Sequence, residues 1–394
     1  MLESLPTQRP AGCPFDPPEE LARLREQDPL TRLAFPDGHR GWLVTGHALA
    51  RAVVSDPRFS SRHELMHIPM PGMAPTESIP PAGPGMFIGH DAPEHTRYRR
   101  LLMGKFTLRR MRQLTERVEE VTAAQLDAME QQGPVVDLMR TYAQPIPALM
   151  ICELLGVPYD EHETFQRHTM ALNDHNATVE DRGAAMNALG TMLYELVVAK
   201  RAAPTDDVLG DLAAGDELTD EELTNIAVLL LGAGLDTTAN MIALGTFALL
   251  QHPEQLAAMR SGPEVVDTAV EELLRYLSIA HTGVRTALED VELDGRPIKA
   301  GETVVLSVMA ANRDPARFAD PDRLDVRRRA TGHLALGFGI HQCLGQQLAR
   351  VEMRVAFPAL FTRFPDLRLA VPAGEVPLRT DSDIYGVERL PVAW

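Results

Sequence analysis

The stretch "LALGFGIHQCLGQQLAR", residues 334–350, decides the fold of this chain. It holds Cys343, one of only three cysteines in 394 residues, between a glycine-rich loop and a run with helical spacing. Glycine permits unusual backbone angles and the close approach of a flat ligand to the main chain. At a helix start, the unpaired N–H groups and the helix dipole favour a thiolate. The loop therefore predicts a thiolate that faces a ligand.

The same loop limits what that ligand can be. A thiolate suits a soft or redox metal, but no second cysteine or close Cys/His set completes a zinc site. A cofactor must then supply the other ligands, as haem does with four pyrrole nitrogens. Two alternatives stay open here: an inert buried cysteine, and a cysteine hydrolase with His341 as base. The hydrolase is disfavoured because residues two apart on a tight loop seldom place a base in reach of its nucleophile.

Composition and charge set the class of protein. With 45% hydrophobic and 24% charged residues, the chain is typical of a soluble globular protein, either one large domain with lobes or two closely packed ones. Its formal charge of −17 argues against non-specific nucleic-acid binding. The odd number of cysteines and an N-terminus without the apolar core of a signal peptide predict a reducing, cytoplasmic compartment.

The hydrophobic pattern favours a mainly α fold with small β-sheets. Two strand-like runs around Pro36-Asp37-Gly38 predict a hairpin. Helical periodicity dominates from about 93 to 275, and strand patterns return near 283–310 and at the C-terminus. Residues 60–88 form a long Met-, Pro- and Gly-rich segment without a clear period, and such loops are often functional.

One apolar run, residues 226–250, is long enough to raise the question of a membrane span. The aspartate at its middle, Asp236, and the absence of flanking cationic anchors favour a helix buried inside a soluble protein. Thr219 and Glu222 form a capping box that opens this helix. No membrane partner is expected.

Polar residues interrupt that helix in "GAGLDTT", residues 232–238. Asp236 and Thr237 would be costly in so apolar a surrounding without a role or a partner. A carboxyl and a hydroxyl that face a pocket could relay protons from solvent to a bound oxygen species. The alternative is that Thr237 bonds back to its own helix and Asp236 pairs with a distant cation.

Two further stretches carry charge. Glu272 and Arg275 lie at i and i+3 in "VEELLRYL", which alone indicates only a solvated helical pair. Residues 97–112 hold six arginines and one lysine in an otherwise acidic chain. That run is either a solvated helix face or a site for an anionic group or an acidic partner.

Taken together and in this order, these stretches resemble the cytochrome P450 family, in particular its soluble, actinobacterial-type haem-thiolate monooxygenases. "GFGIHQCLG" is similar to the haem-binding signature, "AGLDTT" to the oxygen-activation motif, "EELLR" to the Glu-x-x-Arg pair and "HTRYRR" to the propionate-binding helix start. The resemblance spans nearly the whole chain. It implies one P450 domain over residues 1–394, with haem b buried between a long central helix and the cysteine loop. Within that domain we expect a helix-rich part at about 93–275 and 340–365, and β-rich parts at about 30–60, 283–310 and 366–394.

The resemblance also assigns roles to single residues. Cys343 is the implied iron ligand, and Asp236 and Thr237 are the implied acid and alcohol that guide protons. The residues implied to bind the cofactor are His95, Arg99, Ala233, Arg285, His341, Cys343 and Gly345. The implied structural triad is Glu272, Arg275 and Arg323. By position, the substrate pocket is expected near Met86, Phe87, the segment from Phe165 to His175, Ile279, Thr282 and Ile384.

Two positions depart from the family pattern. Leu336 stands where phenylalanine is usual, with Phe338 two residues on, so the shielding of the thiolate and its reduction potential are expected to differ. Leu324 also replaces the usual phenylalanine beside Arg323.

The implied reaction inserts one oxygen atom of O₂ into a bulky hydrophobic molecule, such as a polyketide, macrolide, terpenoid or xenobiotic. No nucleotide or flavin fingerprint is present, so electrons must come from separate proteins, for which a ferredoxin and its reductase are the natural expectation. The basic run around Arg99 to Arg112 could steer that donor. A monomer is expected. The alternatives are a peroxide-dependent or nitric-oxide-reducing relative, and a non-catalytic haem sensor or carrier.

Overall fold

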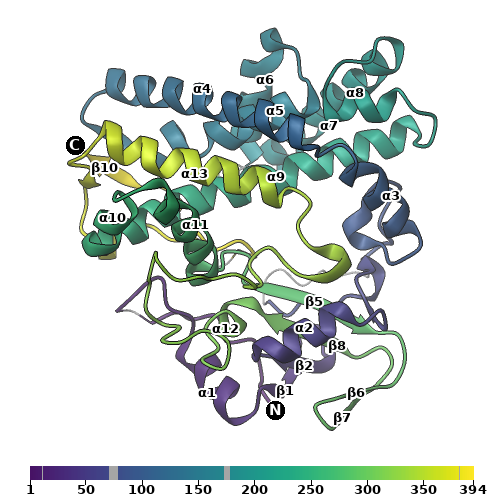
Figure 1. The fold of residues 1–394 in the computed structure, drawn as a ribbon. Coiled ribbons are helices and arrows are strands. Elements are labelled where there is room, and N and C mark those ends of the chain that lie inside the picture. The colour runs from purple at the N-terminus through teal and green to yellow at the C-terminus, as the bar shows by residue number, and fades with distance from the viewer. Residues whose placement is uncertain (11, 71–78, 173–177, 381) are drawn as a thin grey trace.

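A computed structural model describes residues 1–10, 12–70, 79–172, 178–380 and 382–394. Figure 1 shows a helical part that packs on a smaller part built around a sheet. The helices are α1 Glu19–Gln27, α2 His47–Ser55, α3 Glu94–Met103, α4 Leu108–Gln132, α5 Pro145–Leu155, α6 His162–Leu172, α7 Val179–Ala202, α8 Val208–Ala213, α9 Asp220–Gln251, α10 Pro253–Met259, α11 Pro263–Leu277, α12 Val308–Ala311 and α13 Gln346–Arg363. The expected mainly helical fold with small sheets is confirmed.

The strands are short and gather into three sheets. They are β1 Leu30–Ala34, β2 Arg40–Val44, β3 Phe59–Ser60, β4 Val135–Asp137, β5 Thr282–Ala287, β6 Val291–Leu293, β7 Arg296–Ile298, β8 Thr303–Ser307, β9 Arg368–Leu369 and β10 Pro391–Ala393. The main sheet has the order β1-β2-β8-β5-β3, and the other two are β4-β10-β9 and β6-β7.

The predicted hairpin is present, with Leu30 opposite Val44 and Ala34 opposite Arg40 in antiparallel register. β2 then pairs in parallel with β8, more than 250 residues away in the chain, so the N-terminal hairpin is fixed to the strand pair β5-β8. α2 and α12 lie beside this sheet in Figure 1.

The long apolar helix α9 forms the centre of the helical part. The predicted capping box opens it: the Thr219 hydroxyl accepts from the Glu222 amide, and the Glu222 carboxylate accepts from the Thr219 amide at 2.7 Å. α9 contacts α5, α7, α11 and α13, and its residues 238–249 are continuously buried. Among the described helices, α9 is the one that is long and apolar enough to cross a membrane. However, 61% of its most apolar stretch of 18 residues is buried in the protein. Its composition is thus explained by packing inside the fold.

One strand lies within the stretch expected to be helical. Helices run from α3 to α11 as expected, but β4 interrupts them and pairs with the C-terminal strand β10. After β4 the chain forms a short π-helix, Met139–Ala143, before α5. This pairing ties the C-terminus to the helical part of the molecule.

Candidate active site

The loop before α13 has the geometry that its glycines permit. Gly337 and Gly339 have φ angles of +70° and +75°, which only glycine adopts at low cost. A Cβ atom on Gly339 would lie 2.6 Å from the Val54 carbonyl oxygen of α2. The Cys343 amide donates to the Leu336 carbonyl at 2.9 Å, which closes the loop, and α13 begins three residues later at Gln346. In Figure 1 this loop lies between the helical part and the sheet.

A cavity lies between this loop and α9. Its walls come from residues 87–88, α3, α5, α9, the loop and the start of α13. The Cys343 side chain faces this space and is exposed there. Eight residues named from the sequence line it: Phe87, His95, Arg99, Ala233, Thr237, His341, Cys343 and Gly345. Arg285 lines a second hollow that shares His341 with the cavity.

Several basic side chains gather around the cavity. The rings of His95 and His341 lie 4.1 Å apart between centroids. Within the described part of the chain, both ring nitrogens of His95, Nε2 of His341 and Nε of Arg99 are buried without a hydrogen-bond partner. Burial, together with Arg285, His95 and Arg99, lowers the pKa of His341 to about 3. Burial likewise lowers the pKa values of Arg99 and Arg285. Such a set of unpaired donors is suited to an anionic ligand.

The thiol of Cys343 is not pre-ionised by its surroundings. The protein atoms around the cavity desolvate the thiol and raise its pKa, and the backbone of Gly345 and the cations Arg99 and Arg350 oppose this effect. α13 begins three residues after Cys343, so the predicted helix start lies close to the thiol. A metal that binds the sulfur would supply the missing stabilisation, since coordination deprotonates a thiol.

Thr237 and Asp236 point in different directions from α9. Thr237 lines the cavity, and its hydroxyl donates to the Ala233 carbonyl at 2.8 Å. Asp236 lies outside the cavity lining and forms an ion pair with Arg379 at 2.7 Å. Asn240 donates to the same Asp236 oxygen at 3.0 Å. Both features of the alternative interpretation, helix back-bonding and a distant cation, are thus present, while Thr237 still faces the cavity.

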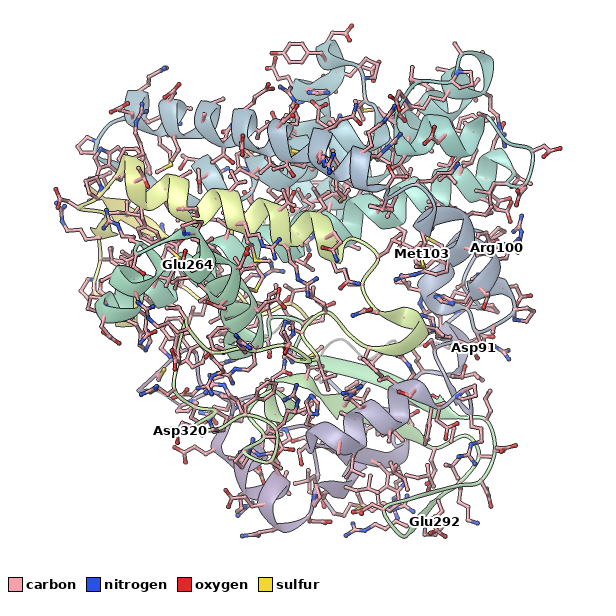
Figure 2. The ribbon with its side chains drawn as sticks, in the orientation of Figure 1. Asp91, Arg100, Met103, Glu264, Glu292 and Asp320 are labelled. Atoms are coloured by element: carbon pink, nitrogen blue, oxygen red, sulfur yellow. The ribbon has the colours of Figure 1, made fainter. Side chains whose placement is uncertain are left out.

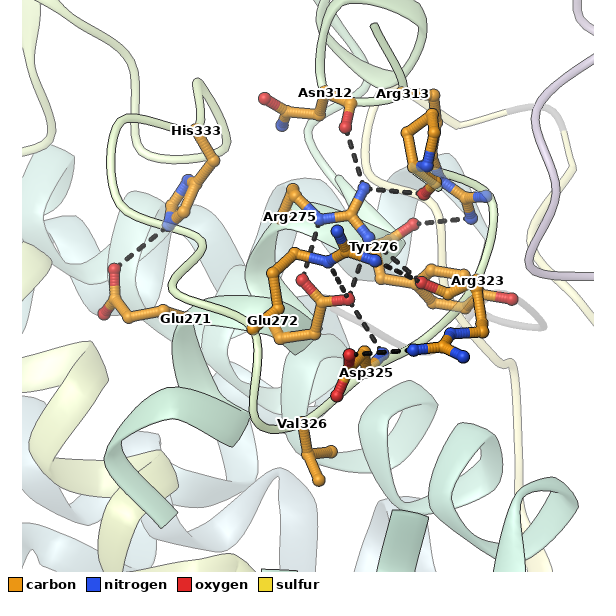
Figure 3. A network of polar contacts seen from close by, with 12 residues as sticks. Glu271, Glu272, Arg275, Tyr276, Asn312, Arg313, Arg323, Asp325, Val326 and His333 are labelled. Carbon is orange, nitrogen blue, oxygen red and sulfur yellow. Dashed lines mark hydrogen bonds and ion pairs between the residues drawn. The ribbon is translucent and has the colours of Figure 1, made fainter. Parts of the chain in front are cut away.

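The Glu272–Arg275 pair is a buried structural centre (Figure 3). Both side chains are fully buried and form two hydrogen bonds, at 2.7 and 2.8 Å. Arg275 also donates to the carbonyls of Asn312 and Pro321, at 2.8 Å each. It is therefore no solvated pair on a helix face, and it anchors α11 to the segment after β8.

The expected third member of this triad is wrong. The Arg323 side chain is exposed and pairs with Asp325 at 3.0 Å, so it points away from Glu272. Arg328 takes its place, with Nε 3.1 Å from the Glu272 carboxylate. The physical reason is local: the Asp325 amide donates to Glu272 at 2.9 Å, which turns the chain so that Arg328 returns toward the pair. Arg323 contributes only its carbonyl oxygen.

The expected substrate-pocket residues are only partly brought together. Phe87 lines the cavity, with Ile88 beside it. Among the described residues, four others lie outside its lining: Met86, Ile279, Thr282 and Ile384. Ile279 and Ile384 nevertheless meet at one place, where an isolated bridge joins Ala280 and Ile384. Of the segment Phe165 to His175, residues 173–177 lie outside the described residues, as do residues 71–78 of the loop 60–88.

Three cations of the basic run are paired with acidic residues of the same chain. Arg97 pairs with Glu222, while Arg109 and Arg110 pair with Asp206. In the part of the chain that the structure describes, Arg100 and Arg112 are exposed and have no ion-pair partner. Figure 2 shows Arg100 on α3, at the side of the molecule. The surface expected to steer a partner is thus smaller than the sequence indicates.

The two departures from the family pattern have different consequences. Leu336 is half-buried against the main core, and Phe338 stacks under the Arg51 guanidinium at 4.0 Å, away from Cys343. Phe338 therefore does not take over the shielding position. Leu324 is buried in the core, so the hydrophobic role of that position is kept.

Sequence reasoning missed three side chains. Glu352 of α13 lines the cavity at 3% exposure, and burial raises its pKa to about 8 against a hydrogen bond from Thr238. Arg379 reaches Asp236 from 143 residues away, and Arg350 binds Glu271. Glu352 lies in α13, the helix that follows the loop, nine residues after Cys343, so helical spacing could have indicated it. No sequence pattern around Arg379 indicates its contact with Asp236.

Comparisons with known proteins agree with this geometry. The Cytochrome P450 family model matches residues 161–382. Cytochrome P450 105C1 of a Streptomyces species is 53% identical over 382 residues, 96% of each chain. Pentalenic acid synthase of Streptomyces avermitilis is 47% identical and covers 97% of this chain and 95% of its own. The solved structure of cytochrome P450 MoxA from Nonomuraea recticatena superposes with a TM-score of 0.92 at 43% identity, covering 99% and 98% of the chains.

The chain therefore belongs to the cytochrome P450 family. It is a monooxygenase, and it binds haem through a cysteine thiolate, as the proteins of this family do. The residues of the cavity fit that cofactor. The unpaired nitrogens of His95, Arg99 and His341 would suit its two carboxylates, and Cys343 faces the same space with its sulfur.

Proposed function

We propose that Cys343 is the sulfur ligand of the haem iron. The observation that carries this assignment is that Cys343 faces a cavity rimmed by unpaired basic groups. Cys152 is fully buried in the helical core, where burial raises its pKa, and Cys13 lines a different cavity. Neither of these two lines the cavity that Thr237 and Cys343 share.

The basic residues take the haem carboxylates. His95 and Arg99 come from α3, His341 from the loop and Arg285 from β5. Three separate parts of the chain thereby meet on one pair of anionic groups, with charge-assisted hydrogen bonds. Ala233 and Gly345 allow close approach because they carry a methyl group and no side chain, respectively. Haem binding should consequently order the contact between α3 and β5.

When bound, the haem activates O₂ so that one oxygen atom enters the substrate. The Thr237 hydroxyl lines the cavity and serves there as a proton donor. Asp236 is the acid that resupplies protons, and it must first leave its ion pair with Arg379. The proton route therefore runs along α9 from the surface of the C-terminal segment.

The substrate is a bulky hydrophobic secondary metabolite, such as a macrolide, another polyketide or a terpenoid. The cavity lining beside Thr237 is apolar, with Phe87, Ile88 and Leu230. The relatives point the same way: one is named pentalenic acid synthase, and a structure of CYP105P1, 43% identical to this chain, contains filipin I. Met86, Ile279, Thr282 and Ile384 would contact the outer part of a large substrate.

Electrons come from a ferredoxin with its reductase, and a docking surface for the ferredoxin includes Arg100 and Arg112. Among the described cations of the basic run that form no ion pair, these two are the exposed ones, and their charge stands out against the net charge of −17. We infer that the whole chain, residues 1–394, is one P450 domain. It functions as a soluble, cytoplasmic monomer.

The test is turnover of the haem-loaded enzyme under oxygen-18-labelled O₂ with ferredoxin, reductase and NADPH. Candidates are first selected by the spin-state shift that they cause, from a panel that contains filipin I and sesquiterpene acids. A hydroxylated or epoxidised product with one labelled oxygen atom supports the proposal. Faster turnover with hydrogen peroxide alone would contradict the O₂-dependent route, and binding without any product would favour a sensor or carrier.

A further inference from the structure

A second cavity lies apart from the cysteine cavity, between the two ends of the chain. Its volume is about 700 Å³, within the range of small-molecule sites. Its walls come from residues 7–10 and 12–15, the end of α9, His281, Met309, residues 373–380 and Tyr385. The described residues that line this cavity and those that line the cysteine cavity do not overlap. It is therefore a separate space.

Arg9 places a cation in this second cavity, and it is fixed there by an aromatic ring and by backbone carbonyls. Its guanidinium carbon lies 3.6 Å from the centre of the Tyr385 ring. Its nitrogens donate to the carbonyls of Asp16, at 3.2 Å, and Pro14, at 3.5 Å. No acidic side chain in the described residues forms an ion pair with it. Burial, together with the nearby Arg313, lowers its pKa to about 10, although Tyr385 and Asp16 act in the opposite direction.

His281 supplies an unsatisfied acceptor on the same wall. Its ring is 6% exposed, and Nε2 lies 2.9 Å from the Ser382 carbonyl, so Nε2 carries the proton. Nδ1 is then a lone-pair acceptor, and it is buried with no hydrogen-bond partner among the residues that the structure describes. An acceptor left unpaired in the interior is costly, and a hydroxyl of a ligand would satisfy it.

The rest of the wall is apolar and partly aromatic. The rings of Phe15 and Phe247 meet edge to face with centroids 5.0 Å apart, and Val376 and Leu378 lie on the opposite segment. Such a wall favours a flat or compact hydrophobic group, while Arg9 and His281 fix its polar ends.

We propose that this cavity binds a small carboxylic acid that carries a hydrophobic ring and a hydroxyl group. The carboxylate accepts hydrogen bonds from Arg9, the hydroxyl donates to Nδ1 of His281, and the ring packs on Phe15 and Phe247. The bound acid joins the N-terminal arm to the C-terminal segment. Thr380 of the wall directly follows Arg379 in the chain. The ligand therefore acts on the segment whose Arg379 pairs with Asp236.

The test uses the haem-loaded enzyme saturated with 4-phenylimidazole, which blocks the cysteine cavity. 4-Hydroxyphenylacetate is the probe and 4-hydroxyphenylacetamide its uncharged match, measured by calorimetry and saturation-transfer NMR. We expect the acid to bind in the blocked enzyme and the amide to bind about tenfold more weakly. No binding of the acid, its displacement by 4-phenylimidazole, or equal affinity for acid and amide would overturn the proposal.

Variants separate the site from a general effect of charge. Arg9→Gln should remove the preference for the acid, whereas Arg23→Gln, an exposed arginine of α1 that pairs with Glu20, should leave it unchanged. Cys13→Phe keeps Arg9 but fills the cavity, and it should abolish binding of both probes. If Arg9→Gln does not fold, Cys13→Phe alone decides: undiminished binding of the acid in that variant refutes the site.

Discussion

The Arg379 guanidinium lies 2.7 Å from the carboxylate of Asp236, so the C-terminal segment holds the one acidic group in the middle of the apolar helix α9. Arg379 is itself fixed by a hydrogen bond to the Ser382 hydroxyl at 3.1 Å. The pair is largely shielded, with 11% and 21% of the two side chains exposed. A proton carrier held in this way can act only when the ion pair opens, which makes Arg379 a positioning residue for the proposed route.

Arg379→Gln should therefore change proton delivery more than haem binding. We expect product formed per electron consumed to fall by about tenfold, less than a full proton-transfer group contributes. Arg379→Lys should restore part of it, because it keeps the charge. The measurement is the ratio of NADPH consumed to product, with the solvent isotope effect. Arg389→Gln, an exposed arginine of the same segment, is the control, and equal coupling in both variants would refute the role.

Thr237→Ala tests the hydroxyl that faces the cavity. It should leave haem content unchanged but lower product per electron by roughly tenfold or more, because the proton donor position is lost. Thr224→Ala is the matched control: Thr224 also bonds back to a carbonyl of α9, that of Asp220, at 2.8 Å, but lies a turn inside the start of the helix. If Thr237 serves only its helix, the two variants should be alike in coupling.

The corrected triad predicts an order of stabilities. Arg275→Ala leaves the Glu272 carboxylate buried, and should lower the free energy of unfolding by about 3–5 kcal/mol. Arg328→Ala removes one hydrogen bond to that carboxylate and should cost about 1–3 kcal/mol. Arg323→Ala should cost less than about 1 kcal/mol, because its pair with Asp325 is exposed. Urea unfolding of the three variants measures this, and a larger loss for Arg323→Ala than for Arg328→Ala would restore the original triad.

Glu352 predicts a pH dependence of stability. Burial raises its pKa from 4.5 to about 8 in the folded protein, so the folded state holds a proton that the unfolded chain releases. Stability from this group is therefore lost as the pH rises from about 5 to 8, by at most about 1.4 kcal/mol per pH unit. Glu352→Gln should flatten that slope.

Unfolding midpoints between pH 5 and 9 check this sign. Glu292→Gln, an exposed residue of β6 at the edge of the molecule in Figure 2, should behave as the wild type does. A wild-type stability that rises over the same interval relative to Glu352→Gln would show that the carboxyl is ionised in the fold.

Local patterns carried much of the fold. The hairpin follows from turn residues between alternating strands, and the Thr219–Glu222 capping box marks the start of α9 to the residue. The cavity residues Cys343, His341 and Thr237 were found because each belongs to a short motif. The features that the sequence did not predict depend on the direction in which a side chain turns and on pairs of residues that are far apart in the chain.

Arg323 and Arg328 show that the direction of a side chain is hard to predict. Both belong to the segment that passes Glu272, and the hydrogen bond from the Asp325 amide to Glu272 decides which of the two side chains turns inward. Arg379 and Asp236 illustrate distance, because 143 residues separate two partners that no periodicity connects. The neutralisation of Arg109 and Arg110 by Asp206 is of the same kind. Tertiary contacts of this sort leave no local trace in the sequence.

The central claim is that Cys343 binds the haem iron as a thiolate, and the carbon monoxide difference spectrum of the reduced protein tests it most directly. The account predicts the long-wavelength Soret band of a haem-thiolate in the wild type and in Cys152→Ala, and its loss in Cys343→Ala. A band of the same position in Cys343→Ala, or a wild type that binds haem without giving this band, would contradict the assignment.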